Sequence, residues 1–280
     1  MYKINTFDNR IEISGIDFDI RHICDCGQCF RFLPFEGGYL GVAYGRPIYM
    51  ENSSDGVSLH CSQSEFDTVW KDFFDLDTDY AAIAQALPKD GFTSAAVEFG
   101  RGLRILRQEP WEALCSFIIS QCNNIPRIQS IIDRLCRLFG EETEWRGQTL
   151  YTFPSAERLA QCTAEDLAPL RCGYRAPYII SAAKTVAACG SYFEELADLP
   201  TPEARKKIME LEGVGPKVAD CFLLFGLHKL DAFPVDTWMK KAAVYYGGKF
   251  DPSLFGEYAG IAQQYIFYYA RSGKGTQEQS

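Results

Sequence analysis

The stretch LEGVGPKVADCF, residues 211–222, places two glycines, a proline and a lysine directly before an apolar run that predicts a helix. The two glycines leave backbone N–H groups uncovered and allow another backbone to approach closely. Lys217 falls in the first turn of this helix, where the positive end of the helix dipole disfavours a cation. Either the lysine points into water or its amine has a chemical role.

A Gly-Val-Gly turn at a helix start has two common roles. It can be an ordinary connection between helices, or its N–H groups can bind a phosphate. A P-loop is excluded because GxxxxGK[ST] is absent, and a Rossmann fingerprint is excluded because no strand precedes the turn. From the turn alone, the ordinary connection is favoured.

Asp236 begins the next predicted helix, in FPVDTWMKKAA (residues 233–243). Its simplest role is that of an N-cap. A loop running back along the first helix, over residues 228–235, would bring Asp236 beside Lys217. An amine beside a carboxylate can attack a carbon to form a Schiff base, while the carboxylate stabilises positive charge or moves protons.

The periodicity of the chain changes along its length. Residues 10–62 alternate and are rich in aromatic, β-branched and glycine residues, which predicts strands. From about residue 80 onward nearly every segment has a helical repeat, with stops at proline and glycine. We predict an α+β protein: an antiparallel-sheet domain over residues 1–98 packed on a mainly helical domain over residues 99–271. The polar tail, residues 272–280, is expected to be disordered.

The acidity of the chain is confined to its first part. Of the net charge of −9, all falls in residues 1–100, and the remaining 180 residues are neutral overall. Phosphates respond to a local patch because charges are screened beyond ~10 Å. The composition therefore does not exclude nucleic acid as a partner.

The sequence also indicates a compartment. No run of 18 apolar residues predicts a membrane helix, and MYKINTFDNR lacks the apolar core of a signal peptide. The 11 cysteines are odd in number and irregularly spaced, which favours reduced thiols. We expect an intracellular monomer, cytoplasmic or at the nucleoid if bacterial, without a membrane partner.

Taken together, LEGVGPKVADCFLLF and FPVDTWMKKAA resemble the helix-hairpin-helix and Gly/Pro…Asp signature of the HhH-GPD superfamily of DNA glycosylases. Other stretches, in the same order and over most of the chain, resemble its 8-oxoguanine DNA glycosylase/AP lyase branch. These stretches are GQCFRF (27–32), GLRILRQEPWEALCSFIIS (102–120), NNIPRI (123–128), GYRAPYI (173–179) and YAGIAQQYIFYYA (258–270). The resemblance implies a TATA-binding-protein-like N-terminal domain. It also implies a bifunctional repair enzyme that flips 8-oxoguanine out of duplex DNA, excises it through a lysine Schiff base and nicks the strand by β-elimination.

The resemblance assigns the reacting groups. Lys217 takes the position of the nucleophile, and Asp236 that of the essential carboxylate. The backbone at Gly213, Val214 and Gly215 would grip a phosphate beside the lesion. A monovalent cation can bind at such a hairpin, and no other cofactor is implied.

A base pocket is implied as well. Gly27 matches the glycine whose carbonyl accepts the N7–H of 8-oxoguanine, Cys221 and Phe267 match the pair that sandwiches the base, and Gln263 matches the reader of its Watson–Crick edge. The spacings agree, because Lys217 and Cys221, and likewise Gln263 and Phe267, are four residues apart on one helix face. Seen alone, the cysteine and phenylalanine would be core residues and the glutamine a surface residue.

Further matches concern the rest of the duplex. Tyr174 resembles the wedge that fills the vacated stack, and Arg127 and Arg175 resemble the arginines that contact the orphaned cytosine. Seen alone, the two arginines would be solvated charges.

Two departures from the family pattern bear on DNA contacts. Cys122 stands where the family has the first asparagine of a triplet, although Asn123 keeps the second and is expected to face DNA. Trp238 stands two residues after the catalytic aspartate, where the family has histidine, and is also expected at the DNA. The preference for the opposite base is therefore left open.

Metal binding is not expected. His22, Cys24, Cys26 and Cys29 are zinc-type ligands, but their spacing is not that of a standard knuckle. The iron–sulphur cluster of a related branch needs four cysteines near the C-terminus. No cysteine follows Cys221, which excludes that cluster.

Two alternatives remain. A glycosylase for another damaged base would share the fold, but monofunctional alkyl-base enzymes lack the hairpin lysine. A non-catalytic helix-hairpin-helix module would bind DNA through its backbone and would need neither Lys217 nor Asp236.

Overall fold

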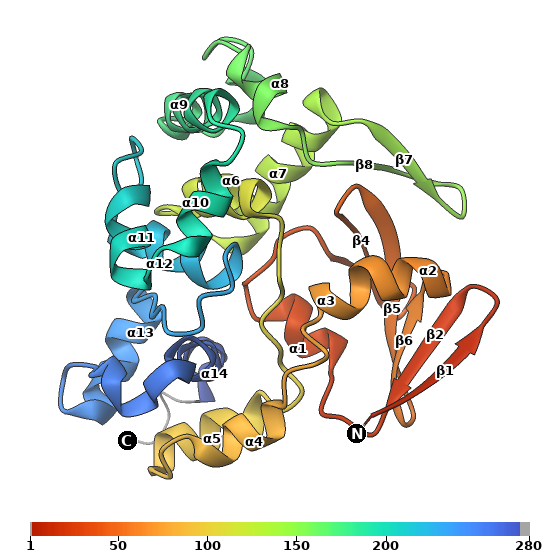
Figure 1. Ribbon diagram of the computed structural model, residues 1–280, viewed down its shortest axis with the longest axis vertical. Helices are drawn as coiled ribbons and strands as arrows, with labels where there is room; N and C mark the ends of the chain where they lie inside the picture. Colours follow the sequence, from red (N-terminus) through yellow and green to blue (C-terminus); the bar gives the residue numbers. More distant parts are fainter. Residues whose placement is uncertain (1, 275–280) are drawn as a thin grey trace. The chain divides into compact units, whose positions relative to one another are not determined.

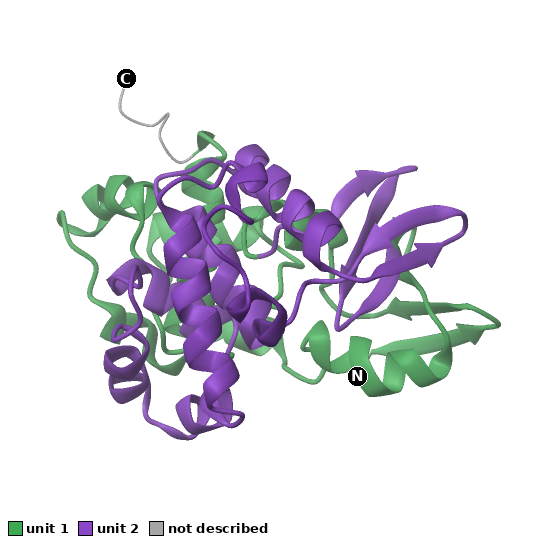
Figure 2. Ribbon diagram, turned by 90° about the horizontal axis from the view of Figure 1, so that it is seen from above, with its two compact units in different colours: residues 1–28, 50–107, 228–280 green, residues 29–49, 108–227 purple. Residues whose placement is uncertain are grey.

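The computed structural model describes residues 2–274 (Figure 1). Part of the predicted disordered tail, residues 275–280, lies outside the described residues. The chain divides into two compact units, drawn in two colours in Figure 2. Unit 1 comprises residues 1–28, 50–107 and 228–280, and unit 2 comprises residues 29–49 and 108–227. These units are discontinuous, whereas the predicted domains 1–98 and 99–271 are continuous stretches.

The N-terminal region contains an antiparallel sheet of six strands, in the order β1-β2-β6-β5-β4-β3. Along β2 and β6, Ile11 pairs with Leu59 and Ile13 with Val57, and these four side chains are at most 1% exposed. Alternation along a strand therefore turns one face of the sheet into core. The strands are β1 (Lys3–Phe7), β2 (Arg10–Ser14), β3 (Leu33–Phe35), β4 (Gly38–Ala43), β5 (Arg46–Ser53) and β6 (Gly56–His60).

The helices of unit 1 begin at side-chain caps in several places. Asp79, Asp90 and Asp236 each accept a backbone N–H in the first turn of the helix that follows. Helix α14 packs on α5 and α13. The elements are α1 (Ile20–Asp25), α2 (Gln63–Glu65), the π-helix η1 (Phe66–Trp70), α3 (Lys71–Phe73), α4 (Tyr80–Ala86), α5 (Gly91–Phe99), α13 (Thr237–Ala242), the 3-10 helices η3 (Ala243–Tyr246) and η4 (Pro252–Tyr258), and α14 (Ala259–Arg271).

Unit 2 is built around α6, of which eight residues from Glu112 to Ile119 are buried. Helices α7, α9 and α12 pack on α6, and α11 packs on α12. The elements are α6 (Pro110–Ser120), α7 (Ile125–Phe139), β7 (Glu142–Trp145), β8 (Gln148–Tyr151), α8 (Ala156–Ala160), the 3-10 helix η2 (Ala168–Leu170), α9 (Arg175–Ala188), α10 (Tyr192–Asp198), α11 (Thr201–Ile208) and α12 (Pro216–Phe225).

The α+β prediction is confirmed, with two local differences. Residues 20–25, inside the stretch 10–62 that was predicted as strands, form helix α1, whose first turn is capped by Asp19 and whose buried residues Ile20, Ile23 and Cys24 have helical spacing. The hairpin β7–β8 interrupts the stretch that was predicted to be helical. Arg146 and Gly147 form its two-residue turn, and both have positive φ, 45° and 79°. Such a turn matches the twist of a hairpin, so Arg-Gly was the local signal that could have revealed it.

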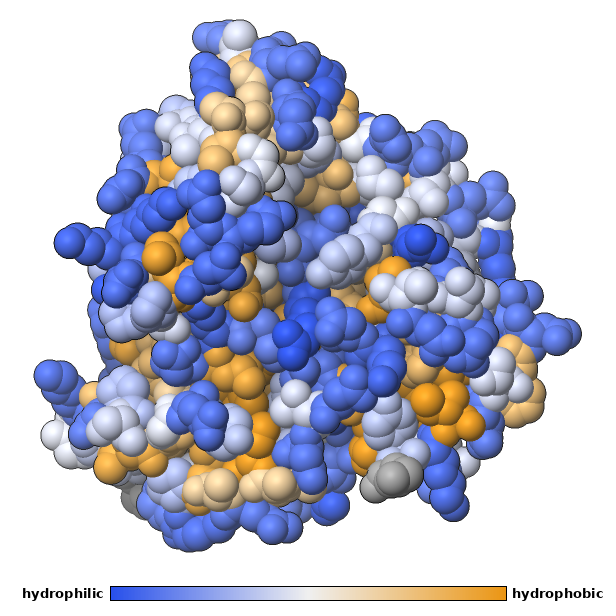
Figure 3. All heavy atoms as spheres, viewed as in Figure 1, coloured by the Kyte–Doolittle hydropathy of each residue, from blue (hydrophilic) through white to orange (hydrophobic). Residues whose placement is uncertain are grey.

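Between residues 2 and 274, no helix combines the length and the apolar character needed to cross a bilayer. Figure 3 shows hydrophobic residues at several places on one face, separated by hydrophilic ones. Exposed apolar side chains are ordinary on protein surfaces.

Candidate active site

The turn between α11 and α12 has the geometry of a backbone anion site. Gly213 has φ +79°, and a Cβ there would lie 2.3 Å from the ring of Tyr178, so only glycine fits. Gly215 is the N-cap of α12 and offers no side chain to its first turn. The first N–H groups of α12 therefore have no side-chain acceptor of the usual N-cap kind, which is the arrangement that binds a phosphate.

Lys217 follows on the first turn of α12 and is half-buried. Its Nζ donates to the hydroxyl of Ser120, at the end of α6, over 3.3 Å. The same nitrogen lies 5.4 Å from the ring centroid of Phe117. Within unit 2 no carboxylate forms an ion pair with this amine.

Cys221 lies one turn further along α12 and is 4% exposed. The predicted shared face of Lys217 and Cys221 thus runs along a helix that packs on α6. Asp220, also on α12, is held by Arg205 of α11, with Nε at 2.6 Å from Oδ1. Burial raises the pKa of Asp220, against the opposing effect of Arg205. This pair joins the two helices of the hairpin that carries Lys217.

The predicted DNA contacts of unit 2 differ in exposure. Tyr174 is 51% exposed, as a wedge requires, and its hydroxyl lies 3.4 Å from the carbonyl of Gln121. Arg175 is only 3% exposed, and its guanidinium donates to the carbonyls of Gln121, Cys122 and Cys172. In this structure Arg175 holds the loop after α6, and its contact with an orphaned base stays a prediction.

The loop between α6 and α7 carries the departure at Cys122. Cys122 is exposed and has φ +46°, a conformation unusual for a residue other than glycine. Asn123 donates to the carbonyl of Ile119 over 3.1 Å, and Asn124 caps α7 by accepting the N–H of Arg127. Arg127 itself is exposed.

In unit 1, Asp236 is the N-cap of α13. Its Oδ1 accepts the N–H of Met239 over 2.9 Å. The cap role expected for an aspartate here is therefore confirmed, and it occupies one of the two carboxylate oxygens. Trp238, in the first turn, is half-buried, and the amine of Lys241 lies 4.2 Å from its ring centroid.

Helix α14 carries the predicted base readers. Gln263 is 3% exposed, and within the described residues its Oε1 is buried without a hydrogen-bond partner. A buried amide oxygen without a partner is costly, so it is a candidate acceptor for a ligand. Phe267, one turn on, is half-buried, with the guanidinium carbon of Arg271 at 5.4 Å from its ring centroid.

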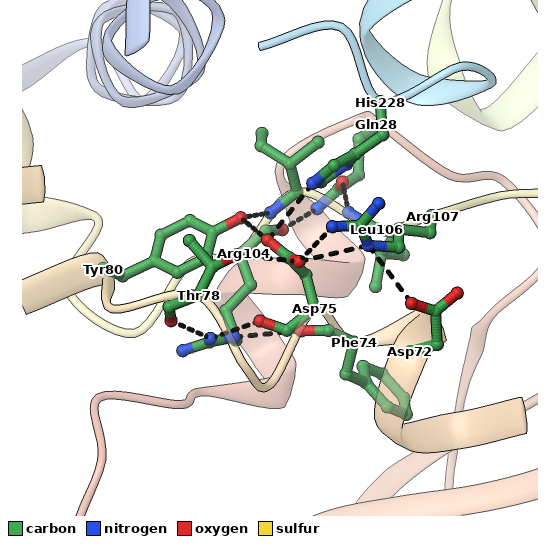
Figure 4. Close-up of polar contacts among 11 residues, drawn as sticks. Gln28, Asp72, Phe74, Asp75, Thr78, Tyr80, Arg104, Leu106, Arg107 and His228 are labelled. Atoms are coloured by element: carbon green, nitrogen blue, oxygen red, sulfur yellow. Dashed lines mark hydrogen bonds and ion pairs between the residues drawn. The ribbon is translucent and has the colours of Figure 1, made fainter. Parts of the chain in front are cut away.

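Gly27 has φ +81°, so a left-handed backbone is required at this position. The next residue, Gln28, is completely buried and fixes this turn. Its Nε2 donates to the carbonyl of Arg104 over 2.8 Å, and its Oε1 accepts the N–H of Leu106 over 2.9 Å (Figure 4). The loop that carries Gly27 is thereby tied to a second segment of unit 1.

Arg104 extends this network, as Figure 4 shows. Its guanidinium donates to the carbonyls of Phe74, Asp75 and Thr78 over 3.0, 2.6 and 2.8 Å. It also lies 4.3 Å from the ring centroid of Tyr80. Burial lowers the pKa of Arg104, although neighbouring Tyr80 and Asp75 oppose that effect.

The carboxylate of Asp75 completes the network. Tyr80 donates to it over 3.0 Å and Arg107 over 2.9 Å, and Nε2 of His228 lies 3.2 Å from Oδ2. Burial alone would raise the pKa of Asp75, but His228 and Arg107 outweigh it, and the pKa is lowered.

The chain is similar to known families over most of its length. The family described as "8-oxoguanine DNA glycosylase, N-terminal domain" matches residues 10–114, and the "HhH-GPD superfamily base excision DNA repair protein" family matches residues 115–249. A Methanothermobacter thermautotrophicus protein named "Probable N-glycosylase/DNA lyase" is 33% identical over 228 residues, covering 71% of each chain. The chain belongs to the 8-oxoguanine DNA glycosylase branch of the HhH-GPD superfamily.

Two solved structures of this family resemble the chain over nearly its whole length. MBOgg1 "in complex with low affinity DNA ligand" has 38% identity and a TM-score of 0.92, covering 98% of this chain and 99% of its own. The Clostridium acetobutylicum 8-oxoguanine glycosylase/lyase, bound to duplex DNA with cytosine opposite the lesion, has 34% identity and a TM-score of 0.90, covering 98% of both chains. The predicted family is thus confirmed.

The predicted glycosylase residues divide between the units. Unit 2 carries Lys217, Cys221, the hairpin backbone and the residues expected to contact DNA at 123, 127, 174 and 175. Unit 1 carries Gly27, Asp236, Trp238, Gln263 and Phe267. Within unit 2, Lys217 and Cys221 lie on α12, directly after the Gly213–Gly215 turn. Within unit 1, Gln263 and Phe267 lie on α14. The individual roles of all these residues stay predictions.

Several polar residues near these groups were not predicted. Ser120 and Gln28 lie inside the stretches that resemble the family, but neither has a periodic or motif signal of its own. Arg31 and Glu112 form a buried pair in unit 2, with Arg31 Nη1 at 3.7 Å from the carboxylate. Burial raises the pKa of Glu112 to about 7.

Metal ligands are not grouped in the structure. Among residues 2–274, no three His, Cys, Asp or Glu side chains are arranged to hold a metal ion.

Proposed function

We propose that the protein is a bifunctional DNA glycosylase/AP lyase that excises 8-oxoguanine from duplex DNA in base excision repair. The observation that carries the proposal is Lys217, placed on the first turn of α12 directly after the Gly213–Gly215 turn, in a chain of this family. A backbone phosphate site beside a primary amine holds a DNA strand next to a nucleophile. A phosphate-binding turn alone does not need a lysine beside it, and a lysine alone does not need such a turn.

The chemistry follows from the amine. As a neutral group, Lys217 attacks C1′ of the flipped nucleotide; a C1′–Nζ bond forms, the bond to the base breaks, and the base leaves with the electron pair and takes up a proton. Opening of the C1′–O4′ bond gives the Schiff base. Loss of a C2′ proton then expels the 3′ phosphate oxygen and nicks the strand. Asp236 stabilises the positive charge that develops on the sugar.

Recognition of the base is assigned to Gly27, Cys221, Gln263 and Phe267. The Gly27 carbonyl would accept the N7–H of 8-oxoguanine, and the unpartnered Oε1 of Gln263 would accept from its Watson–Crick edge. Phe267 and Cys221 would supply stacking surfaces, and Tyr174 would fill the vacated stack. Arg127, Arg175, Asn123 and Trp238 are proposed to contact the duplex.

The proposal needs no redox or organic cofactor. The turn at residues 211–215 offers backbone carbonyls, which are suitable ligands for a hard cation. A monovalent cation bound there would supply charge for the phosphate. We further propose that the protein acts inside the cell as a monomer.

Borohydride trapping tests the proposal. The protein is incubated with duplexes that carry 8-oxoguanine opposite each of the four bases, and borohydride reduces any Schiff base to a stable adduct. We expect an adduct with 8-oxoguanine and none with undamaged guanine. Lys217→Gln should lower its yield by at least ~10³-fold, since the nucleophile is removed. Lys184→Gln, an exposed lysine of α9, is the matched control.

The outcome also separates the alternatives. An adduct only with alkylated or other oxidised bases would identify a glycosylase of different specificity. Binding to duplex DNA without any adduct would identify a non-catalytic module. An adduct that survives Lys217→Gln would contradict the assigned nucleophile. The yields opposite the four bases report the preference left open by Cys122.

A further inference from the structure

The end of α6 presents a hydroxyl to the amine of Lys217. Ser120 is the last residue of this helix, and its Oγ accepts from Lys217 Nζ at 3.3 Å. The same Oγ donates its own hydrogen to the carbonyl of Phe117 over 2.8 Å. A hydroxyl has one hydrogen and two lone pairs, so Ser120 can only accept from the lysine.

This direction of hydrogen bonding constrains the amine. A serine near a helix end often bonds to the carbonyl three residues back, and alone that bond would be purely local. Here it fixes the hydroxyl with its lone pairs toward Lys217. A neutral amine has two hydrogens and one lone pair, and one hydrogen is then directed at Ser120. The lone pair consequently lies on another side of the nitrogen and does not face Ser120.

The rest of the surroundings reinforces this orientation. The ring of Phe117 lies below the amine, 5.4 Å from Nζ to the centroid, and is itself 2% exposed. It is stacked on Phe225 at 5.3 Å between centroids and meets Phe30 at 6.0 Å, so it cannot turn aside. Its face attracts the charged form of Lys217 but offers no lone pair to compete for an N–H.

We propose that Ser120 is a positioning residue for the glycosylase reaction: it orients the Lys217 amine so that its lone pair faces the sugar carbon. The inference rests on the proposed function, because it presumes that Lys217 is the nucleophile. Ser120 is assigned no contact with the substrate; its only proposed effect on the reaction is through its hydrogen bond to the Lys217 amine.

Single-turnover borohydride trapping with an 8-oxoguanine duplex tests this role in the full-length protein. We expect Ser120→Ala to slow adduct formation about tenfold, the worth of one hydrogen bond in orienting the nucleophile. Duplex affinity should stay unchanged, since Ser120 makes no proposed DNA contact. Ser120→Thr keeps the hydroxyl and its bond to the helix carbonyl, and should restore the rate to within about twofold. Ser116→Ala, a buried serine one turn earlier on α6, should react as the wild type does.

The inference would be overturned by equal rates for Ser120→Ala and the wild type. It would also be overturned if the alanine and threonine variants were equally slow, because the space at Ser120 rather than its hydroxyl would then matter. If the wild type itself forms no adduct, the proposed function fails and this inference fails with it. A wild-type adduct together with an unaffected Ser120→Ala would remove only the role of Ser120.

Discussion

Arg104 in unit 1 and Lys217 in unit 2 are both cations set among apolar side chains, but their partners differ. Arg104 is 2% exposed and donates to backbone carbonyls at four residues. Lys217 is half-buried and makes one hydrogen bond, at 3.3 Å, within its unit. Because its N–H groups are engaged by carbonyls, the Arg104 guanidinium holds three chain segments together and is not available to react. A sparsely held amine stabilises the fold little and remains available to react.

The difference separates two uses of a buried charge. In the Arg104 network every partner is a main-chain group or a residue of the same unit, so the network contributes to the stability of that unit. Within unit 2, the one hydrogen-bond partner of the Lys217 amine is a hydroxyl, and an aromatic ring faces it. We therefore expect substitutions in the Arg104 network to lower the free energy of unfolding without changing adduct formation. Substitutions at the side chains that contact the Lys217 amine should change adduct formation without lowering the free energy of unfolding.

Arg104→Met is expected to have the largest effect on stability. The carbonyls of Phe74, Asp75 and Thr78 would lose their donor while still buried, which should lower the free energy of unfolding by about 3–5 kcal/mol. Urea unfolding measures the loss, and Arg101→Met, at a side chain 65% exposed, is the control. Below the unfolding transition, adduct yield per folded molecule should match the wild type. A loss under about 1 kcal/mol in the free energy of unfolding would show that the network does not stabilise the fold as proposed.

Glu112 offers a case between these extremes, a buried carboxyl whose charged partner is Arg31. Its pKa is raised from 4.5 to about 7, chiefly by burial, so the native state prefers the protonated form. Its contribution to stability is unaffected below pH 4 and falls as the pH rises from 4.5 through 7. The loss reaches up to about 3 kcal/mol.

Glu112→Gln should remove this pH dependence. The variant should be close to the wild type in stability at pH 5 and more stable, relative to it, at pH 8. Thermal unfolding at both pH values measures the change. Glu142→Gln, at an exposed residue of β7, should give the same offset at each pH. A Glu112→Gln offset that is likewise independent of pH would mean that the carboxyl is ionised throughout.

The smallest effects are expected at the two glycines of the hairpin turn. One of them is needed for packing, and the other is proposed to bind phosphate through its backbone. Gly213→Ala would place a Cβ 2.3 Å from the Tyr178 ring at a φ of +79°, and should cost about 1–3 kcal/mol of stability. At Gly215 a Cβ meets nothing within 4 Å, so Gly215→Ala should leave stability within about 0.5 kcal/mol. If a phosphate binds there, Gly215→Ala should still weaken duplex binding. Unchanged binding by both variants at equal fold content would contradict the phosphate site.

The sequence was most informative where neighbours along the chain determine structure. The strand region and the helical region follow from periodicity, and Asp236 as a helix cap follows from its position. Lys217 stood out because its place at a helix start is electrostatically unusual. These are local signals, and the structure confirms them apart from helix α1 in the strand region and the hairpin β7–β8 in the helical region.

Contacts between distant segments could not be predicted in this way. Lys217 and Ser120 are 97 residues apart, and Gln28 and Arg104 are 76 apart. No periodicity connects such pairs; only the folded chain brings them together. Arg175 is instructive for the same reason, since its sequence context predicts a DNA contact while the structure buries its guanidinium against the carbonyls of residues 121, 122 and 172.

The discontinuity of unit 1 has a consequence for how the protein is made. On the ribosome, residues 1–28 and 50–107 emerge long before residues 228–280, yet Gln264 of α14 must reach the carbonyl of Cys26 and α14 must pack on α5. Unit 2 has its full set of residues once position 227 is synthesised. A chain interrupted there would possess the hairpin and its lysine but not the carboxylate of Asp236. Nascent fragments that end there would therefore carry the proposed nucleophile without the carboxylate that is proposed to stabilise positive charge on the sugar.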